Sequence, residues 1–179
     1  MKKLLLLAVA VLAATVTLNA QTKRWNIGFG GGVALPAADL ADYTSVGLTG
    51  FVFGSFNITK GFSGGVELGF TTLTPDAVDD IDLDNTTIRS FLFKGVYTFS
   101  KPQIRPYVSL FTGFYSSRIS KCLYVNEDET KSTIIMDNSY GYGIEAGIRK
   151  GKFNFGTAYH VVAIDFKYVL FKLGYTISF

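Results

Sequence analysis

Four charged residues stand in stretches of the chain that are otherwise apolar or small. Glu67, Lys94 and Glu145 each lie six residues from a short turn sequence, and Lys172 lies seven residues before the end of the chain. In strands of one sheet, this spacing places two carboxylates and two ammonium groups at nearly one level, allowing for the stagger of tilted strands. Arg149 lies on the same face as Glu145, nearer the turn, and is expected to extend this cluster.

Such a cluster could act in two ways. Exchange of ion-pair partners would make it a gate that opens a narrow path. Fixed pairing would make it a plug that satisfies the charges and fixes the strand register. An unpaired buried charge carries a large desolvation penalty, so we expect one hydrogen-bonded ionic network in either case.

Two further sets of residues could carry catalysis or bind a metal ion. His160 is the single histidine, so a Ser-His-acid arrangement would have to use it. A lipid deacylase is expected to show a His-x-Ser pair, whereas valines follow His160. Asp80, Asp82 and Asp84 loosely resemble a calcium loop, but the glycine and the distant glutamate of that motif are missing. We therefore predict no enzyme activity, no metal ion and no cofactor.

The elements that carry these residues alternate between apolar and small or polar side chains, which is the strand signal. This pattern predicts eight strands, at about 25–35, 46–58, 62–73, 86–99, 105–118, 138–150, 152–163 and 168–179. Most are as long as the about 9 to 11 residues that a tilted strand needs to cross a bilayer. Short basic joins alternate with long ones, among them Asp76 to Asn85 and Ile119 to Asp137. The sequence therefore predicts an all-β, eight-stranded antiparallel up-and-down transmembrane β-barrel, with its short turns in the periplasm.

Periodicity alone does not say which face of the strands is outside, and a soluble lipocalin-like barrel would hide its apolar face. The polar face of the first strand, with Asn26, Gly28 and Gly30, carries no charge and would make a poor solvent surface. Aromatic residues near strand ends resemble the interface girdles of membrane barrels: Trp25, Phe62, Phe99, Tyr107, Phe153 and Phe179. A lysine on the lipid face at mid-membrane would cost roughly 2 to 4 kcal/mol, so Lys172 is expected to point inward.

The first 20 residues have the order of a secretory signal peptide. Lys2 and Lys3 precede an apolar run from Leu4 to about Val16, and the small Ala20 follows. An uncleaved anchor helix is the alternative. Without the two lysines the formal net charge falls from +3 to +1, which gives no argument for nucleic acid. Cys122 is the single cysteine, so it is idle or pairs between molecules.

Taken together, residues 21–179 resemble the small outer-membrane barrels of Gram-negative bacteria, the OmpA transmembrane domain and OmpX among them. The cleavable signal, the eight amphipathic strands, the loop alternation, the interior charges and the final "YTISF" carry this resemblance. It implies an outer-membrane location among outer-membrane lipids. It also implies that Tyr175, Ile177 and Phe179 form a signal for the barrel assembly machinery. Since Phe179 ends the chain, no peptidoglycan-binding domain is expected.

The expected function is structural or interactive, through external loops around Asp76 to Asn85 and Ile119 to Asp137. The extracellular ligand or partner is not identified by the sequence. Because eight strands leave no continuous aqueous channel, the interior charges are expected to form a plug rather than a gate. The alternatives are a small porin-like or hydrophobic-ligand transport barrel and, third, a lipid-modifying enzyme that uses His160.

Overall fold

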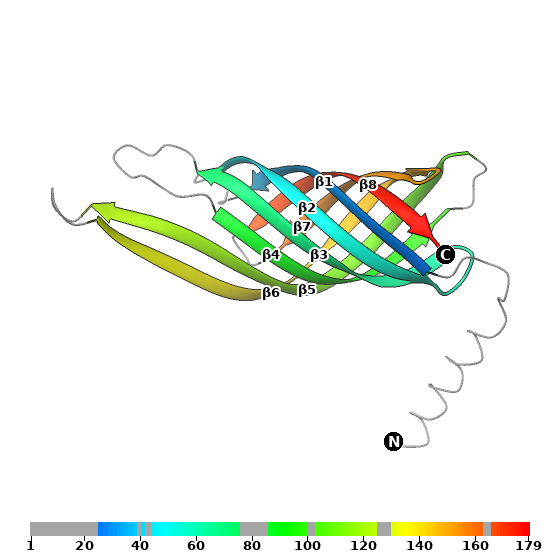
Figure 1. The fold of residues 1–179 in the computed structure, drawn as a ribbon, viewed down its shortest axis with the longest axis horizontal. Coiled ribbons are helices and arrows are strands. Elements are labelled where there is room, and N and C mark those ends of the chain that lie inside the picture. Colours follow the sequence, from blue (N-terminus) through cyan, green and yellow to red (C-terminus); the bar gives the residue numbers. More distant parts are fainter. Residues whose placement is uncertain are drawn as a thin grey trace, which may run out of the picture.

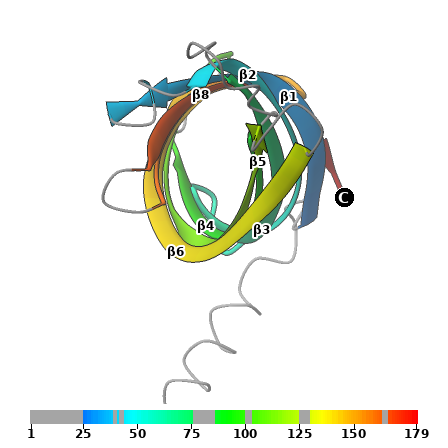
Figure 2. The ribbon, with the colours of Figure 1, turned by 90° about the vertical axis from the view of Figure 1, so that its left-hand side faces the viewer.

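Eight strands pair in chain order and close on themselves in the computed structural model (Figure 1). The structure describes residues 25–38, 41, 44–75, 86–99, 103–124, 130–162 and 166–179. The strands are β1 (Trp25–Ala37), β2 (Thr44–Asn57), β3 (Phe62–Pro75), β4 (Thr86–Thr98), β5 (Arg105–Tyr124), β6 (Thr130–Lys150), β7 (Phe153–Val161) and β8 (Lys167–Ser178). All neighbours are antiparallel, and β1 pairs with β8, so the barrel has no open edge (Figure 2). The predicted fold class is confirmed.

Some predictions fall outside the described residues. These are the signal peptide at residues 1–20 and the loop from Asp76 to Asn85. Within the described ranges, no helix is long and apolar enough to cross a membrane.

The connection between β5 and β6 differs from the prediction. The sequence placed a loop from Ile119 to Asp137, but β5 continues to Tyr124 and β6 begins at Thr130. Ile119 pairs with Ile135, and the ladder ends at Tyr124 opposite Thr130. The loop prediction was therefore wrong for most of this segment, because two antiparallel strands that pair with each other need no hydrophobic face to continue.

The apolar residues of the alternating pattern face outward. Leu48 is 70% exposed and its neighbour Thr49 is 8% exposed, and the same alternation holds around the barrel. Outward side chains include Trp25, Ile27, Phe29, Val52, Leu68, Phe91, Phe93, Leu110, Phe114, Ile144, Phe155, Phe171 and Leu173. So broad an exposed apolar surface is typical of a lipid-facing barrel. The lipocalin-like alternative, with these residues inside, is wrong.

Small inward residues make room for large inward rings. A Cβ added at Gly30 would meet the ring of Phe51 and the carbonyl oxygen of Leu173. A Cβ added at Gly143 would meet the ring of Phe111 and the carbonyl oxygen of Tyr159. These inward glycines therefore leave the space that inward aromatic rings fill.

The outer part of the interior is apolar. Inward residues nearer the long connections form one buried cluster: Ala34, Leu73, Ile88, Leu92, Phe111, Tyr115, Ala158, Val162, Tyr168 and Leu170. At the opposite end the strands are joined by short turns. At one of them, Gly151 takes a φ of 60°, which suits the first position of a two-residue hairpin turn.

This packing predicts that Gly143→Ala destabilises the barrel by about 1 to 3 kcal/mol, because the methyl group has no space beside Phe111. Gly50→Ala is the matched control, since a Cβ at Gly50 would meet nothing within 4 Å. Urea unfolding in lipid vesicles, followed by tryptophan fluorescence and by electrophoresis without boiling, measures both. Equal stability of the two variants would contradict the arrangement.

Candidate functional site

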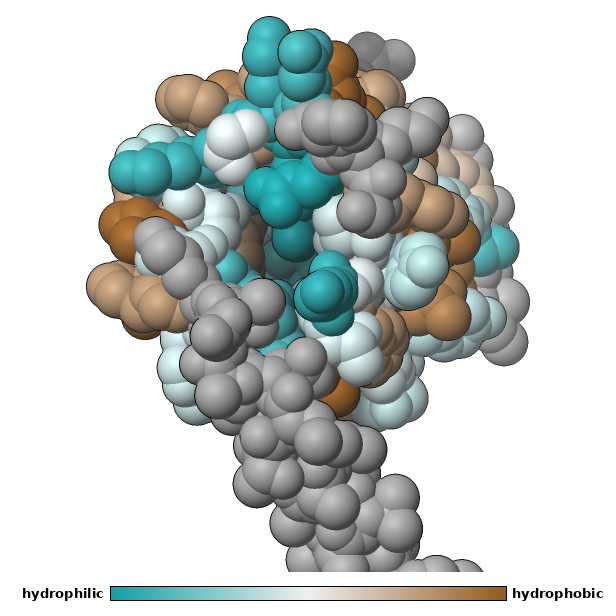
Figure 3. All heavy atoms as spheres, turned by 90° about the vertical axis from the view of Figure 1, so that its right-hand side faces the viewer, coloured by the Kyte–Doolittle hydropathy of each residue, from teal (hydrophilic) through white to brown (hydrophobic). Residues whose placement is uncertain are grey.

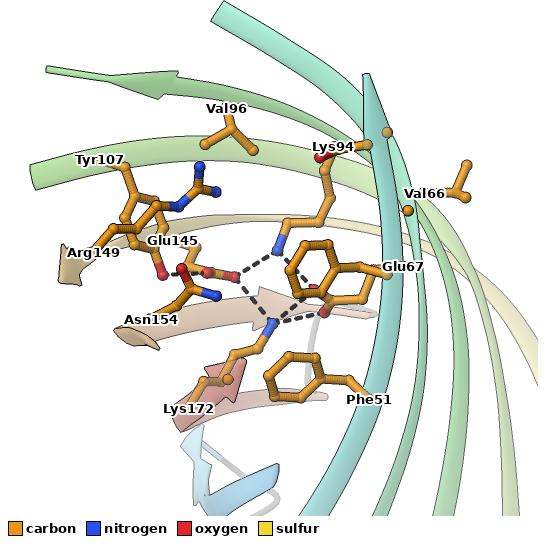
Figure 4. Close-up of a pocket in the computed structure, with 15 residues that line it drawn as sticks. Phe51, Val66, Glu67, Lys94, Val96, Tyr107, Glu145, Arg149, Asn154 and Lys172 are labelled. Carbon is orange, nitrogen blue, oxygen red and sulfur yellow. Dashed lines mark hydrogen bonds and ion pairs between the residues drawn. The ribbon is translucent and has the colours of Figure 1, made fainter. Parts of the chain in front are cut away.

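Four strands contribute one charged side chain each to the middle of the barrel. Glu67 lies on β3, Lys94 on β4, Glu145 on β6 and Lys172 on β8. The residues on either side of each point outward because side chains alternate along a strand. In Figure 4, Val66 points away from the cluster while its neighbour Glu67 points into it. We call these four residues the ionic core.

The ionic core is a closed ring of ion pairs. Lys94 Nζ lies 2.8 Å from Glu67 Oε2 and 2.7 Å from Glu145 Oε2. Lys172 Nζ lies 2.7 Å from Glu67 Oε1 and 3.1 Å from Glu145 Oε2. Each lysine thus donates to both carboxylates, and the four charges sum to zero. The structure brings together all four residues that the sequence placed at one level.

Two aromatic residues that the sequence analysis did not assign to this site complete its surroundings. The Tyr107 hydroxyl donates to Glu145 Oε1 at 2.7 Å. Lys172 Nζ lies 4.2 Å from the centre of the Phe51 ring, a cation–π distance. Tyr107 is only 4% exposed, so its prediction as an outward girdle residue was wrong. The alternation of side chains along the strand could have predicted this orientation. Val108 and Leu110 face outward, so Tyr107 must face inward.

Arg149 lies beside the ionic core but is not a member of its ring. Among the described residues, its guanidinium forms no ion pair with either glutamate. It lies 5.0 Å from the centre of the Tyr107 ring, and Nη1 donates weakly to Thr98 Oγ1 at 3.5 Å. Its Nε is buried without a hydrogen-bond partner. Arg149 therefore contacts the network through Tyr107, not through a carboxylate.

His160 packs against the apolar cluster above the ionic core. It is 2% exposed, its Nδ1 lies 2.9 Å from the Tyr115 hydroxyl, and its ring stacks on Tyr168 at 4.6 Å. In the part of the chain that the structure describes, His160 has no hydrogen bond to a serine or a carboxylate. The geometry of a Ser-His-acid triad is not present around this histidine.

The space at the ionic core is small. A cavity of about 40 Å³ lies beside the four charges, with Tyr107, Arg149 and Asn154 also in its wall (Figure 4). That volume holds a few water molecules at most, since one water needs roughly 10 to 15 Å³. The described residues contain no group of three or more His, Cys, Asp or Glu that could hold a metal ion. The arrangement therefore favours a fixed set of ion pairs over a site that transfers a chemical group.

Comparison with known proteins identifies the fold. No family model matches the chain, and no curated protein matches it. Among solved structures, Neisserial surface protein A matches with a TM-score of 0.60 and 12% identity over 87% of this chain and 97% of that one. OprG of Pseudomonas aeruginosa matches with a TM-score of 0.54 and 11% identity, covering 86% of this chain and 96% of that one. Ail of Yersinia pestis, the attachment invasion locus protein, matches with a TM-score of 0.50 and 15% identity, covering 87% and 100%.

The chain has the fold of the small eight-stranded outer-membrane barrels. The resemblance seen in the sequence is confirmed at the level of fold, and identities this low extend it no further.

The ring geometry predicts that substitutions of Glu67 and Lys172 have strongly coupled effects on stability. Glu67→Gln alone leaves the lysines short of one buried negative charge and is expected to cost about 3 to 5 kcal/mol of stability. Glu67→Gln with Lys172→Met leaves a neutral Lys94–Glu145 pair, so the double variant should lose at least about 1 kcal/mol less than the sum of the single variants.

Urea unfolding in vesicles measures this double-mutant cycle. Lys150→Gln is the control, since Lys150 is exposed at the short-turn end and its loss should change stability by less than about 0.5 kcal/mol. Additive single effects would show that the ring does not act as a unit.

Proposed function

We propose that the chain is an integral outer-membrane protein with a sealed lumen, and that it serves a structural or surface-interaction role through its long-loop end. The observation that carries this proposal is the β5–β6 ribbon, the part of the hairpin that extends past the barrel wall (Figure 1). The outward apolar surface supports the membrane location, with outer-membrane lipids as the surrounding partner.

The ribbon continues the β5–β6 pairing past the neighbouring strands on both sides. Pairing of β4 with β5 ends at Thr87 opposite Arg118, and pairing of β6 with β7 ends at Tyr142 opposite Val161. Pairing between β5 and β6 nevertheless continues to Tyr124 opposite Thr130. Among the described residues, the two strands beyond the wall therefore pair only with each other, and a strand edge of this kind is able to add a further strand from a partner.

A sealed lumen is supported by two successive layers. The ionic core fills the middle, and the buried apolar cluster with His160 lies between it and the long connections. Two buried layers of this kind disfavour the porin-like and hydrophobic-ligand alternatives. None of the described residues around His160 favours the lipid-modifying alternative.

The end of β8 supports the proposed recognition by the barrel assembly machinery. Ile177 and Phe179 face outward, and Tyr175 lies on the same side, against Phe29 and Phe153. The Phe179 amide donates to the Trp25 carbonyl oxygen at 2.9 Å, so the last residue takes part in closing the barrel. This segment is therefore both the proposed signal and part of the β1–β8 seam.

A sealed lumen predicts no single-channel conductance in planar bilayers. Both buried layers would have to open for ions to pass, so the purified protein should give no resolved current steps, as should a boiled sample. Steady steps whose size changes in Lys94→Ala or Glu145→Ala would contradict the proposal and favour a transport barrel.

The ribbon itself is tested by shortening it. Replacing residues 120–134 by Asn-Gly keeps the Ile119–Ile135 pair and removes no contact between β4 and β5 or between β6 and β7. Cells that carry the shortened chain should lose adherence to immobilised matrix proteins and to other cells. The protein should still migrate as a folded barrel before boiling.

Two controls accompany this experiment. An epitope inserted between Tyr124 and Thr130 should be labelled on intact cells, whereas the same epitope between Gly151 and Lys152 should need permeabilised cells. Equal adherence of cells with the full chain, the shortened chain and no chain would overturn the interaction role. Labelling of the Gly151 epitope on intact cells would overturn the orientation.

A further inference from the structure

A basic hollow opens at the short-turn end of the barrel. It has a volume of about 590 Å³ and contains four cationic side chains: Lys60, Arg105, Arg149 and Lys152. The remaining polar wall consists of amides and hydroxyls from Asn26, Asn57, Thr59, Ser63, Thr98, Asn154, Thr176 and Ser178. The described residues that line it include no acidic side chain. Figure 3 looks onto this end and shows the hollow among hydrophilic residues. We call it the basic vestibule.

Two arginines in the basic vestibule face each other without compensation. Arg105 on β5 is directly opposite Arg149 on β6 in the strand register. Like charges directly opposite each other on one face of a sheet destabilise the pair. In the ionic core, by contrast, every charge has a partner of opposite sign.

Among the described residues, no acid is placed to neutralise these arginines. Glu67 is occupied by both lysines of the ionic core, and Glu145 by those lysines and Tyr107. Every other acidic residue of the chain falls in the long connections or in the outer half of the β5–β6 hairpin. The strands around the basic vestibule contribute only cationic and neutral side chains.

Arg149 lies at the edge of the vestibule with few polar contacts. Its guanidinium lies 5.0 Å from the centre of the Tyr107 ring, its hydrogen bond to Thr98 is long at 3.5 Å, and its buried Nε has no partner among the described residues. Arg149 and Asn154 line both the cavity of the ionic core and the basic vestibule, so they form the boundary between them. A guanidinium presents a fork of N–H donors that matches two oxygens of one phosphate group.

We propose that the basic vestibule is a binding site for a phosphate group, in which Arg149 and Arg105 hold the oxygens and Lys60 and Lys152 add charge at the rim. The phosphate belongs either to a soluble phosphorylated compound or to the headgroup of an anionic phospholipid in the adjoining leaflet. An anion of charge −2 or more relieves the arginine repulsion, which single hydroxyl or amide partners do not.

The test uses pyrophosphate and the intact protein in octyl glucoside, a detergent without phosphate. Calorimetric titration should show saturable binding. Arg149→Gln should weaken it about tenfold or more, because it removes charge-assisted hydrogen bonds. Arg105→Gln should weaken it as well. Since Arg105 is exposed, its replacement leaves the folded barrel intact.

Lys150→Gln is the matched control. It removes the same charge from the adjacent residue, which is exposed and does not line the basic vestibule, so affinity should change less than about twofold. Absence of saturable binding would overturn the site. Equal weakening by Lys150→Gln and Arg149→Gln would do the same, because it would show only general attraction between charges.

A second arm distinguishes the two sources of phosphate. The titration is repeated in nanodiscs of phosphatidylcholine alone and with added phosphatidylglycerol. Binding that depends on Arg149 and is unaffected by phosphatidylglycerol supports a soluble ligand. Competition by phosphatidylglycerol that is lost in Arg149→Gln supports a lipid headgroup. Binding independent of Arg149 in both membranes overturns the proposal.

Discussion

Two carboxylates and two ammonium groups share a barrel interior too narrow to hydrate them separately, and this constraint organises the molecule. Glu67, Lys94, Glu145 and Lys172 come from four different strands, so their pairing requires all of β3, β4, β6 and β8 in one register. A slip of one residue would turn a charge toward lipid and several apolar side chains inward. Closure, register and orientation of the barrel therefore depend on the same ring of ion pairs.

The rest of the interior follows from the need to fill the space around that ring. Rings from β2 and β5 occupy it, and glycines on β1 and β6 leave them room, as Phe51 with Gly30 and Phe111 with Gly143 show. The low charge of the inward face has the same origin, because any further charge would need a partner that the packed interior cannot supply.

The alternation of outward and inward residues was predictable because lipid and lumen impose it on each strand separately. Six strands end within two residues of the predicted bounds, and the four charges were placed from their distance to the short turns. The wrong predictions concern features that are set by the pairing of strands or by the position of a residue within its strand. The ribbon beyond Arg118 lacks the regular alternation of apolar and polar residues that marks the other strands, and only pairing with the partner strand makes it β-structure. Tyr107 was assigned by its position near a strand end, although its parity with Ser109 placed it inside.

The acidic residues outside the ionic core are unevenly distributed. In the sequence they fall in the long connections and the outer β5–β6 hairpin, where cations such as Lys121 and Lys131 accompany them, whereas the described residues that line the hollow at the short-turn end include cations and no acid. A buried neutral ring with apolar packing above it lies between the two ends, so neither end can neutralise the other across the barrel. Charges separated by more than about 10 Å in salt solution are largely screened in any case. The short-turn end must therefore draw its counter-charges from the solution or the lipid leaflet on its own side, which makes it a surface chemically independent of the long-connection end.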